Sequence, residues 1–128
     1  MHIIFITPAS ALRRFPVYRL GSRFYGHPNA ITGPLILGGI LKKAGHTVEV
    51  YEELNGKVPL EKCLKEADVF SLYTMTSTAP RAYRLADIIH ASSDARVIIG
   101  GIHASALPEE AASHADHVIV GEGESVIL

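Results

Sequence analysis

Three short segments of this 128-residue sequence carry the groups that could bind a ligand. Each segment is rich in glycine or hydroxyl residues and directly follows an apolar run. Glycine lets a backbone approach a ligand without a Cβ in the way, and exposed N–H groups near helix starts bind anionic or carbonyl oxygens. The predicted binding residues are Thr74, Thr76 and Ser77, then Gly100, Gly101 and His103, then Gly121, Glu122 and Gly123.

Each segment also has an explanation that involves no ligand. A Gly-Gly pair after a strand turns a tight corner, and hydroxyl groups before a helix cap its first turn. Because the pattern recurs after three successive apolar runs, we favour a binding site over three independent turns.

The common nucleotide-binding fingerprints are absent. The first apolar run is followed by Thr7-Pro8-Ala9-Ser10 rather than G-x-G-x-x-G, and no G-x-x-x-x-G-K-[ST] occurs. Dinucleotide or triphosphate binding in the usual mode is therefore disfavoured.

Side chains for metal binding or nucleophilic catalysis form no recognisable set. The seven histidines and Cys63 do not show the spacing of a tetrahedral site with nitrogen and sulfur ligands. His103 and His27 lie in loops on the expected ligand side and stay candidates, whereas the other histidines are expected at or near the surface. Cys63 is expected as a small buried residue. Glu122 and Glu124 are expected to interact with the positive end of a following helix.

The elements that position these segments follow from the pattern of apolar residues. Short β-branched runs alternate with amphipathic segments, which is typical of βαβ units in a parallel sheet. Strands are predicted at His2–Thr7, Thr47–Tyr51, Asp68–Tyr73, Arg96–Ile99 and His117–Val120, and helices at Gly33–Ala44, Leu60–Ala67, Thr78–Ser92 and Pro108–His114.

The predicted fold is α/β, a doubly wound five-stranded parallel sheet of the flavodoxin-like or Rossmann-like kind with strand order 2-1-3-4-5. Right-handed crossovers favour this order, and its switch point lies between the first and third strands. Ligands of such sheets bind outside the carboxyl ends of the strands at that point. The long segment Pro8–Pro34, expected to be a binding loop or a lid, therefore joins the three predicted segments at one edge.

Composition narrows the classes of partner. The length suits one domain, residues 1–128, and 48% hydrophobic with 20% charged residues is ordinary for a globular protein. The 12 Lys and Arg residues against 13 Asp and Glu residues give no basic excess, which argues against a nucleic-acid partner. The one basic cluster, Arg13, Arg14, Arg19 and Arg23, is expected to be a solvated loop.

The sequence contains no apolar run near the roughly 20 residues that span a bilayer, and its start lacks the pattern of a signal peptide. We therefore expect no membrane span and a cytoplasmic location. The turn Gly121–Ser125 is followed by only three apolar residues, too few for a stable helix. We expect the sequence to be an amino-terminal fragment of a longer chain.

Several of these residues resemble a known family. The runs from Gly33 to Val50, from Gly100 to Glu110 and from Asp116 to Glu124 are similar to the amino-terminal cobalamin-binding domain of radical SAM enzymes. The most specific piece is G-G-x-H followed by P-E-E and then by G-E-G-E. The resemblance covers nearly the whole chain apart from Pro8–Thr32.

The resemblance implies a doubly wound sheet that binds cobalamin and continues into a radical SAM barrel. In the family, a C-x-x-x-C-x-x-C motif of that barrel holds a [4Fe–4S] cluster for chemistry with S-adenosylmethionine. That motif is absent here, so cluster and S-adenosylmethionine binding belong to a missing part of the parent protein, a methyltransferase or oxidoreductase. The D-x-H-x-x-G motif, which supplies a histidine to cobalt, is also absent.

Three functions stay open on the sequence alone. The leading one is a cobalamin-binding accessory domain, with the nucleotide tail in the crevice between the first and third strands and the corrin over the strand ends. In it no histidine of the chain ligates cobalt, and the isolated chain is catalytically inert. The second is a degenerate, ligand-free domain that docks on its catalytic partner. The third is an enzyme for a small anionic substrate, which needs a better general base than His103.

Overall fold

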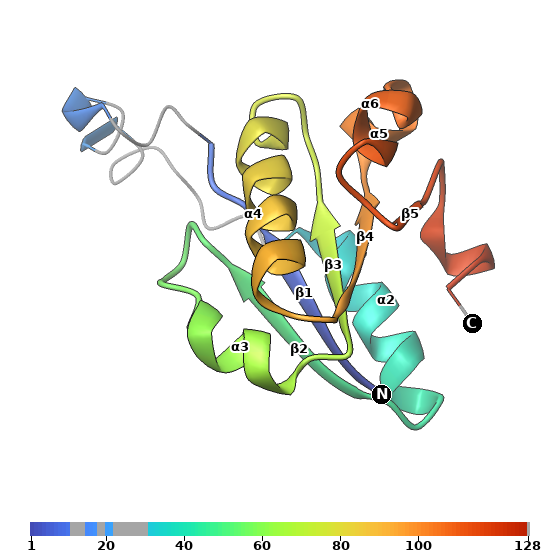
Figure 1. The fold of residues 1–128 in the computed structure, drawn as a ribbon. Coiled ribbons are helices and arrows are strands. Elements are labelled where there is room, and N and C mark those ends of the chain that lie inside the picture. The colour runs from blue at the N-terminus through green and yellow to red at the C-terminus, as the bar shows by residue number, and fades with distance from the viewer. Residues whose placement is uncertain (11–14, 18–19, 22–30, 128) are drawn as a thin grey trace.

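Parallel strands form the centre of the fold, in the order β2-β1-β3-β4-β5 (Figure 1). The computed structural model describes residues 1–10, 15–17, 20–21 and 31–127, and the five strands lie within these ranges. The order and the parallel pairing confirm the doubly wound fold predicted from the sequence. The strands are β1 His2–Thr7, β2 Thr47–Glu52, β3 Val69–Tyr73, β4 Arg96–Gly100 and β5 His117–Val118.

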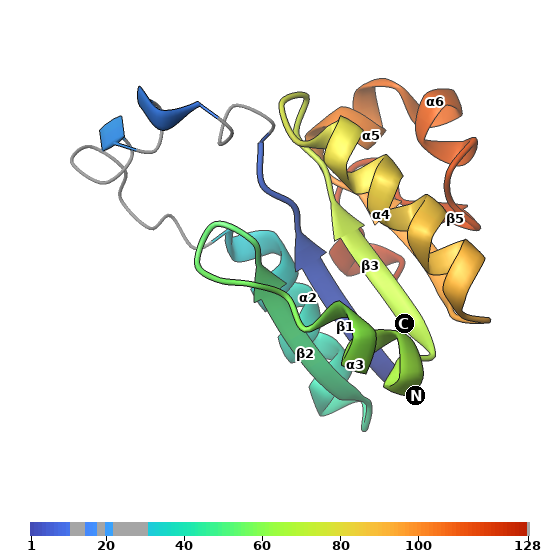
Figure 2. The same cartoon turned by 60° about the vertical axis from the view of Figure 1, so that its left-hand side comes forward.

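Helices lie on both faces of this sheet. Helix α2, Thr32–Lys43, covers one face, while α3, Leu60–Glu66, and α4, Ala79–Ser92, cover the other (Figures 1 and 2). Two short helices, α5 at Ile102–Ala106 and α6 at Pro108–Ala112, follow the carboxyl end of β4. A 3₁₀ turn, η2 at Gly123–Ser125, follows β5. None of the helices in the described ranges is long and apolar enough to cross a bilayer.

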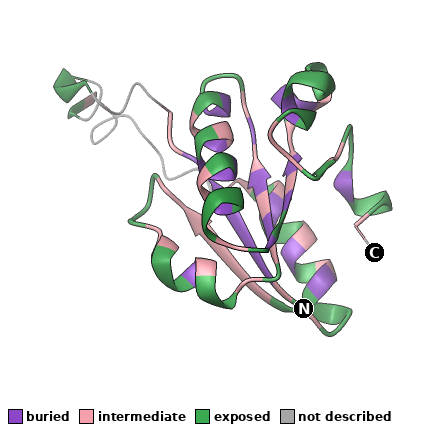
Figure 3. Ribbon diagram, in the orientation of Figure 1, coloured by how far each residue is buried: buried purple, intermediate pink, exposed green. Residues whose placement is uncertain are grey.

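The two faces of the sheet are covered unequally. On the α3 and α4 side, alternate strand residues such as Phe70, Leu72 and Ile99 are completely buried (Figure 3). On the α2 side, Ile3 and Phe5 of β1 are buried with Leu41, but the residues of β3 and β4 that face this side are only half-buried. These half-buried residues are Val69, Ser71, Tyr73, Ile98 and Gly100.

The largest difference from the sequence prediction lies after β4. The sequence predicts no helix between the strand that ends at Ile99 and the helix that begins at Pro108, but Ile102–Ala106 forms helix α5. A turn at Gly101 with φ of +103° starts this helix, and the Ser105 N–H donates to the Gly101 carbonyl at 3.0 Å. Three of the five residues in α5 have weak helix preference or are β-branched, so local preference alone did not indicate it.

Other element bounds differ by a few residues. Helix α2 begins at Thr32, one residue before the predicted start, and α6 ends at Ala112 rather than His114. Strand β5 has two residues rather than four, although the Ile119 N–H still donates to the Ile99 carbonyl at 2.9 Å. Arg13, Arg14, Arg19, Arg23 and His27 lie outside the described residues.

Asp116 attaches the start of β5 to β4. Its carboxylate accepts a hydrogen bond from the Val97 N–H at 2.8 Å, and its own N–H donates to the Val97 carbonyl at 2.9 Å. His90 and Arg96 each contact the carboxylate at 3.1 Å. The Val97 N–H, with His90 and Arg96, lowers the pKa of Asp116 to about 2.

Asp116→Asn is expected to lower the free energy of unfolding at neutral pH by about 1.5–3 kcal/mol, the usual worth of hydrogen bonds to a charged group. Because the pKa is depressed in the folded state, the stabilisation is complete above the ordinary value of 3.8 and is lost as the pH falls toward about 2. Urea unfolding from pH 7 down to pH 3 should therefore show the difference from the parent shrinking below pH 4. Asp94→Asn, at an exposed carboxylate, is the control, and a difference that stays constant with pH would contradict the assignment.

Candidate functional site

A groove opens on the α2 side of the sheet, where β3, β4 and β5 are incompletely covered. Its upper part, at the carboxyl ends of the strands, is a hollow of about 140 Å³. Its lower part is a mostly apolar hollow of about 570 Å³ that extends toward the amino ends. Both parts are lined by Phe5, Ser71 and Ile119, so we treat them as one feature, the α2 groove.

The upper part of the α2 groove contains five of the nine predicted binding residues. Gly100, Gly101, Gly121, Glu122 and Gly123 all line it, from the turns that follow β4 and β5. Glycines at this rim leave backbone atoms, rather than side chains, facing the hollow.

Gly123 brings the last turn against α2. A Cβ at this position would lie 3.0 Å from the Leu37 Cδ1 atom and 3.3 Å from its Cδ2 atom. The absence of a side chain therefore permits η2 to pack on the helix at the rim of the groove. Glu122, which precedes η2, forms no side-chain hydrogen bond to its first turn.

Gly101 brings the turn after β4 against the loop after β3. A Cβ on Gly101 would lie 2.5 Å from the carbonyl oxygen and 2.8 Å from the nitrogen of Thr74, and the φ of +103° also disfavours any other residue. The His103 N–H donates to the same Thr74 carbonyl at 3.2 Å.

Thr74 is buried within this junction and does not line the α2 groove. Its hydroxyl donates to the Gly100 carbonyl at 2.8 Å and accepts from the Ala104 N–H at 3.2 Å. The hydroxyl therefore donates one hydrogen bond and accepts one within the protein. Its role in the described structure is to hold together the loops that follow β3 and β4.

Thr76, Ser77 and His103 lie apart from the α2 groove. Thr76 and Ser77 are exposed on the loop between β3 and α4. His103 is buried, with Nδ1 at 3.3 Å from the Thr76 hydroxyl and Nε2 at 3.0 Å from a Glu110 carboxylate oxygen. The hydrogen bond from His103 lowers the pKa of Glu110, with a smaller effect from Tyr83.

Several groove residues were not found by sequence reasoning. Ser71 and Tyr73 reach the groove from β3, Leu37 from α2 and Ile119 from the residues after β5. Ser71 carried a weak signal, because it is the one polar residue within an apolar strand. The others look like ordinary core residues in sequence, and only the thin cover on this face exposes them.

The groove suits an apolar, flat ligand better than a small anion. Its walls are largely aliphatic and aromatic side chains, with His46 and His117 in the lower part. Among the described residues, the carboxylates at its upper rim are those of Glu122 and Glu124. Two carboxylates would repel an anion, which weakens the case for an enzyme that acts on a small anionic substrate. A separate hollow is lined by Glu53, Arg81 and Lys57, and the Glu53 and Arg81 side chains in it pair at 2.7 Å.

Gly101→Ala should destabilise the protein by at least about 3 kcal/mol, since it combines a strained φ with a clash against backbone that cannot move aside. Gly121→Ala is the matched control, because Gly121 also has a positive φ, +79°, but no atom lies within 4 Å of the added Cβ. Backbone strain alone should cost Gly121→Ala about 1–2 kcal/mol. The measurement is urea unfolding followed by circular dichroism, and equal losses in the two variants would contradict the packing described for Gly101.

Comparison with known proteins gives a family for this arrangement. Residues 18–128 match the family described as the B12 binding domain. This match includes every strand except β1 and every residue of the predicted binding set.

Two curated relatives from Chlorobaculum tepidum are similar over part of the chain. Bacteriochlorophyllide d C-8(2)-methyltransferase is 41% identical over 59 residues, and bacteriochlorophyllide d C-12(1)-methyltransferase is 42% identical over 59 residues. Each alignment covers 46% of this chain but only 13% of the relative. No solved structure matches the chain significantly. With its parallel sheet in the order 2-1-3-4-5 and a family match over most of its length, this chain belongs to the B12-binding domain family.

Proposed function

We propose that this chain is the cobalamin-binding accessory domain of a radical SAM enzyme. In the proposal the nucleotide tail of cobalamin enters the α2 groove and the corrin lies over the carboxyl ends of the strands. The observation that carries the proposal is an apolar groove that opens at a glycine-lined rim in a member of the B12-binding family.

The chemistry of the groove supports this assignment. The benzimidazole of the tail is flat and largely apolar. The walls formed by Phe5, Ile98 and Ile119 are also apolar. The Ser71 hydroxyl offers a polar contact midway along the groove, and the turns at Gly100–Gly101 and Gly121–Gly123 offer backbone groups at its mouth. These residues would hold and orient the cofactor and exclude water from the tail. Bound cobalamin supplies a cobalt centre that can carry a methyl group.

In this arrangement we expect no histidine of the described residues to ligate cobalt, because His46 and His117 line only the lower part of the α2 groove, away from the carboxyl ends over which the corrin is proposed to lie. His103 does not line the α2 groove, and both of its ring nitrogens contact other side chains, Thr76 and Glu110. The residues directly after β1 are Pro8, Ala9 and Ser10, which carry no imidazole. We therefore infer that the described residues of this chain would hold the cofactor through the groove and the rim turns rather than through a histidine bound to cobalt.

The catalytic part of the proposed parent protein lies outside this sequence. The resemblance to radical SAM enzymes and the names of the two methyltransferases support a parent that transfers methyl groups with S-adenosylmethionine and a [4Fe–4S] cluster. This chain has one cysteine, Cys63, which is buried, so it lacks the ligands of such a cluster. The alternative is a domain that docks on its catalytic partner without cobalamin.

Titration of the 128-residue chain with hydroxocobalamin, followed by visible absorption and calorimetry, tests the proposal. One equivalent should bind. Ser71→Leu should weaken binding about fivefold to a hundredfold, because filling the half-buried groove adds an overpacking cost of about 1–3 kcal/mol to the complex. Ser92→Leu makes the same change at an exposed position of α4 and should leave the affinity for cobalamin unchanged. The separate variant His103→Ala should also leave this affinity unchanged.

Two results would overturn the proposal. The absence of binding at high micromolar cobalamin would favour the docking alternative. If His103→Ala loses cobalamin binding while Ser71→Leu retains it, the site lies beside His103 on α5 rather than in the α2 groove.

A further inference from the structure

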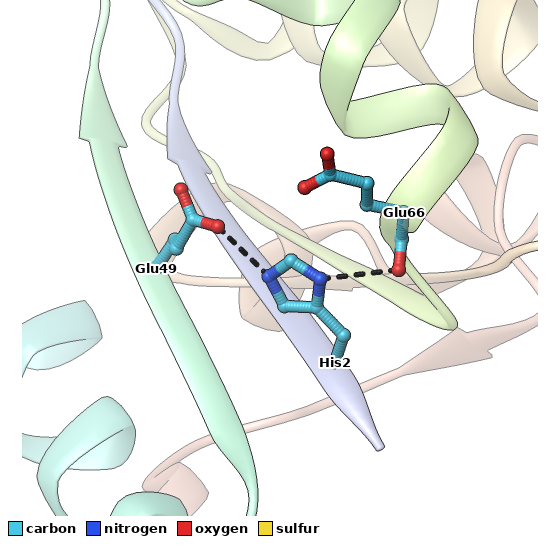
Figure 4. Close-up of side chains that lie close together, drawn as sticks. All are labelled: His2, Glu49 and Glu66. Carbon is cyan, nitrogen blue, oxygen red and sulfur yellow. Dashed lines mark hydrogen bonds and ion pairs between the residues drawn. The ribbon is translucent and has the colours of Figure 1, made fainter.

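A second group of side chains that could bind a ligand lies at the amino-terminal end of the sheet, away from the α2 groove. It comprises His2 on β1, Glu49 on β2 and Glu66 at the end of α3 (Figure 4). One potential metal ligand atom from each of these residues lies within 4.8 Å of the other two. No other group of three such residues is found in the part of the chain that the structure describes.

The ring of His2 is held between two acceptor oxygens. Its Nδ1 lies 3.1 Å from the Glu66 main-chain carbonyl, and its Nε2 lies 2.9 Å from a Glu49 carboxylate oxygen. A carbonyl oxygen only accepts hydrogen bonds, so Nδ1 is the nitrogen that carries the hydrogen. The neutral ring then presents the lone pair of Nε2 to a carboxylate.

The carboxylate of Glu49 is held in place by two contacts. One oxygen lies 2.9 Å from Nε2 of His2, and the other accepts a hydrogen bond from the Tyr51 hydroxyl. The Glu49 carboxylate and the His2 ring therefore face each other beside the Glu66 carboxylate, so that all three can direct a ligand atom at one metal ion.

We propose that His2, Glu49 and Glu66 form a binding site for a divalent transition-metal ion, with Zn²⁺ as the best-suited ion. Imidazole nitrogen and carboxylate oxygen are both ligand types that Zn²⁺ takes in proteins, and water can complete the coordination. Metal-binding histidines typically donate their other N–H to a main-chain carbonyl, as His2 does toward Glu66. The site ties β1, β2 and α3 together, so its role is structural rather than catalytic.

Competing contacts are weak or lie outside the group. Glu66 also pairs with Lys62 at 3.6 Å, but both side chains are about half exposed, and an exposed pair of this kind contributes little stability. The nearby thiol of Cys63 is buried, and burial raises its pKa, which keeps it protonated and disfavours it as a ligand. Asp68 already accepts the His2 main-chain N–H at 2.6 Å.

Calorimetric titration of the 128-residue chain with ZnCl₂ tests the site, with Co²⁺ absorption as a second readout. One equivalent should bind and raise the melting temperature. His2→Gln and Glu66→Gln should each weaken Zn²⁺ binding at least about tenfold, since loss of even an outer contact of a metal site costs about that much. The Co²⁺ complex should show visible bands of nitrogen and oxygen ligands and no thiolate band.

Controls separate this site from general histidine binding. His46→Gln removes another histidine from the same end of the sheet, and His114→Gln removes one that pairs with Asp87 at 2.9 Å. Both should bind Zn²⁺ as the parent does, and Cys63→Ser should leave the Co²⁺ spectrum unchanged. Glu66 is exposed, so Glu66→Gln should fold even if His2→Gln does not.

Three results would overturn the proposal. They are the absence of stoichiometric Zn²⁺ binding, affinity that Glu66→Gln leaves unchanged, and a thiolate band that disappears in Cys63→Ser.

Discussion

The contact between Gly101 and the backbone of Thr74 joins the loops after β3 and β4, and the rest of the site is built on it. Only glycine fits there, because a Cβ would overlap the Thr74 carbonyl oxygen. The Thr74 hydroxyl bridges from β4 to α5. The Ser105 hydroxyl then donates to the Gly101 carbonyl and accepts from the Gly121 N–H, each at 2.9 Å. Two buried or half-buried hydroxyls thus connect the three turns that follow β3, β4 and β5 into one rim.

The unequal cover of the sheet gives that rim a groove to open into. Helices α3 and α4 bury one face, with Phe70, Leu72 and Ile99 fully enclosed, whereas α2 alone leaves β3 and β4 half-exposed on the other. Exposed apolar surface of this kind is costly in water, and a bound apolar group recovers that cost. The fold therefore favours a ligand with an apolar portion on the α2 side, in agreement with the family to which the chain belongs.

The sequence predicted the sheet better than the roles of individual residues. Strand order followed from alternating apolar runs, and the rim glycines were found because they end strands. The role of Thr74 was missed, since its partners Gly100 and Ala104 are more than twenty residues away. The group of His2, Glu49 and Glu66 was missed for the same reason, because parallel pairing of β1 with β2 brings His2 and Glu49 together. Cys63 was predicted to be buried, and the structure confirms it.

Competition between cobalamin and cobinamide tests most directly whether the α2 groove binds the nucleotide tail of cobalamin. Cobinamide keeps the corrin but lacks the tail, so both compounds can be titrated into the same chain and compared by calorimetry. If the tail occupies the groove, cobinamide should bind at least about a hundredfold more weakly, since losing roughly 3 kcal/mol of buried apolar contact corresponds to that ratio. Equal affinity for the two compounds would contradict the account, because it would show that the groove takes no part in binding.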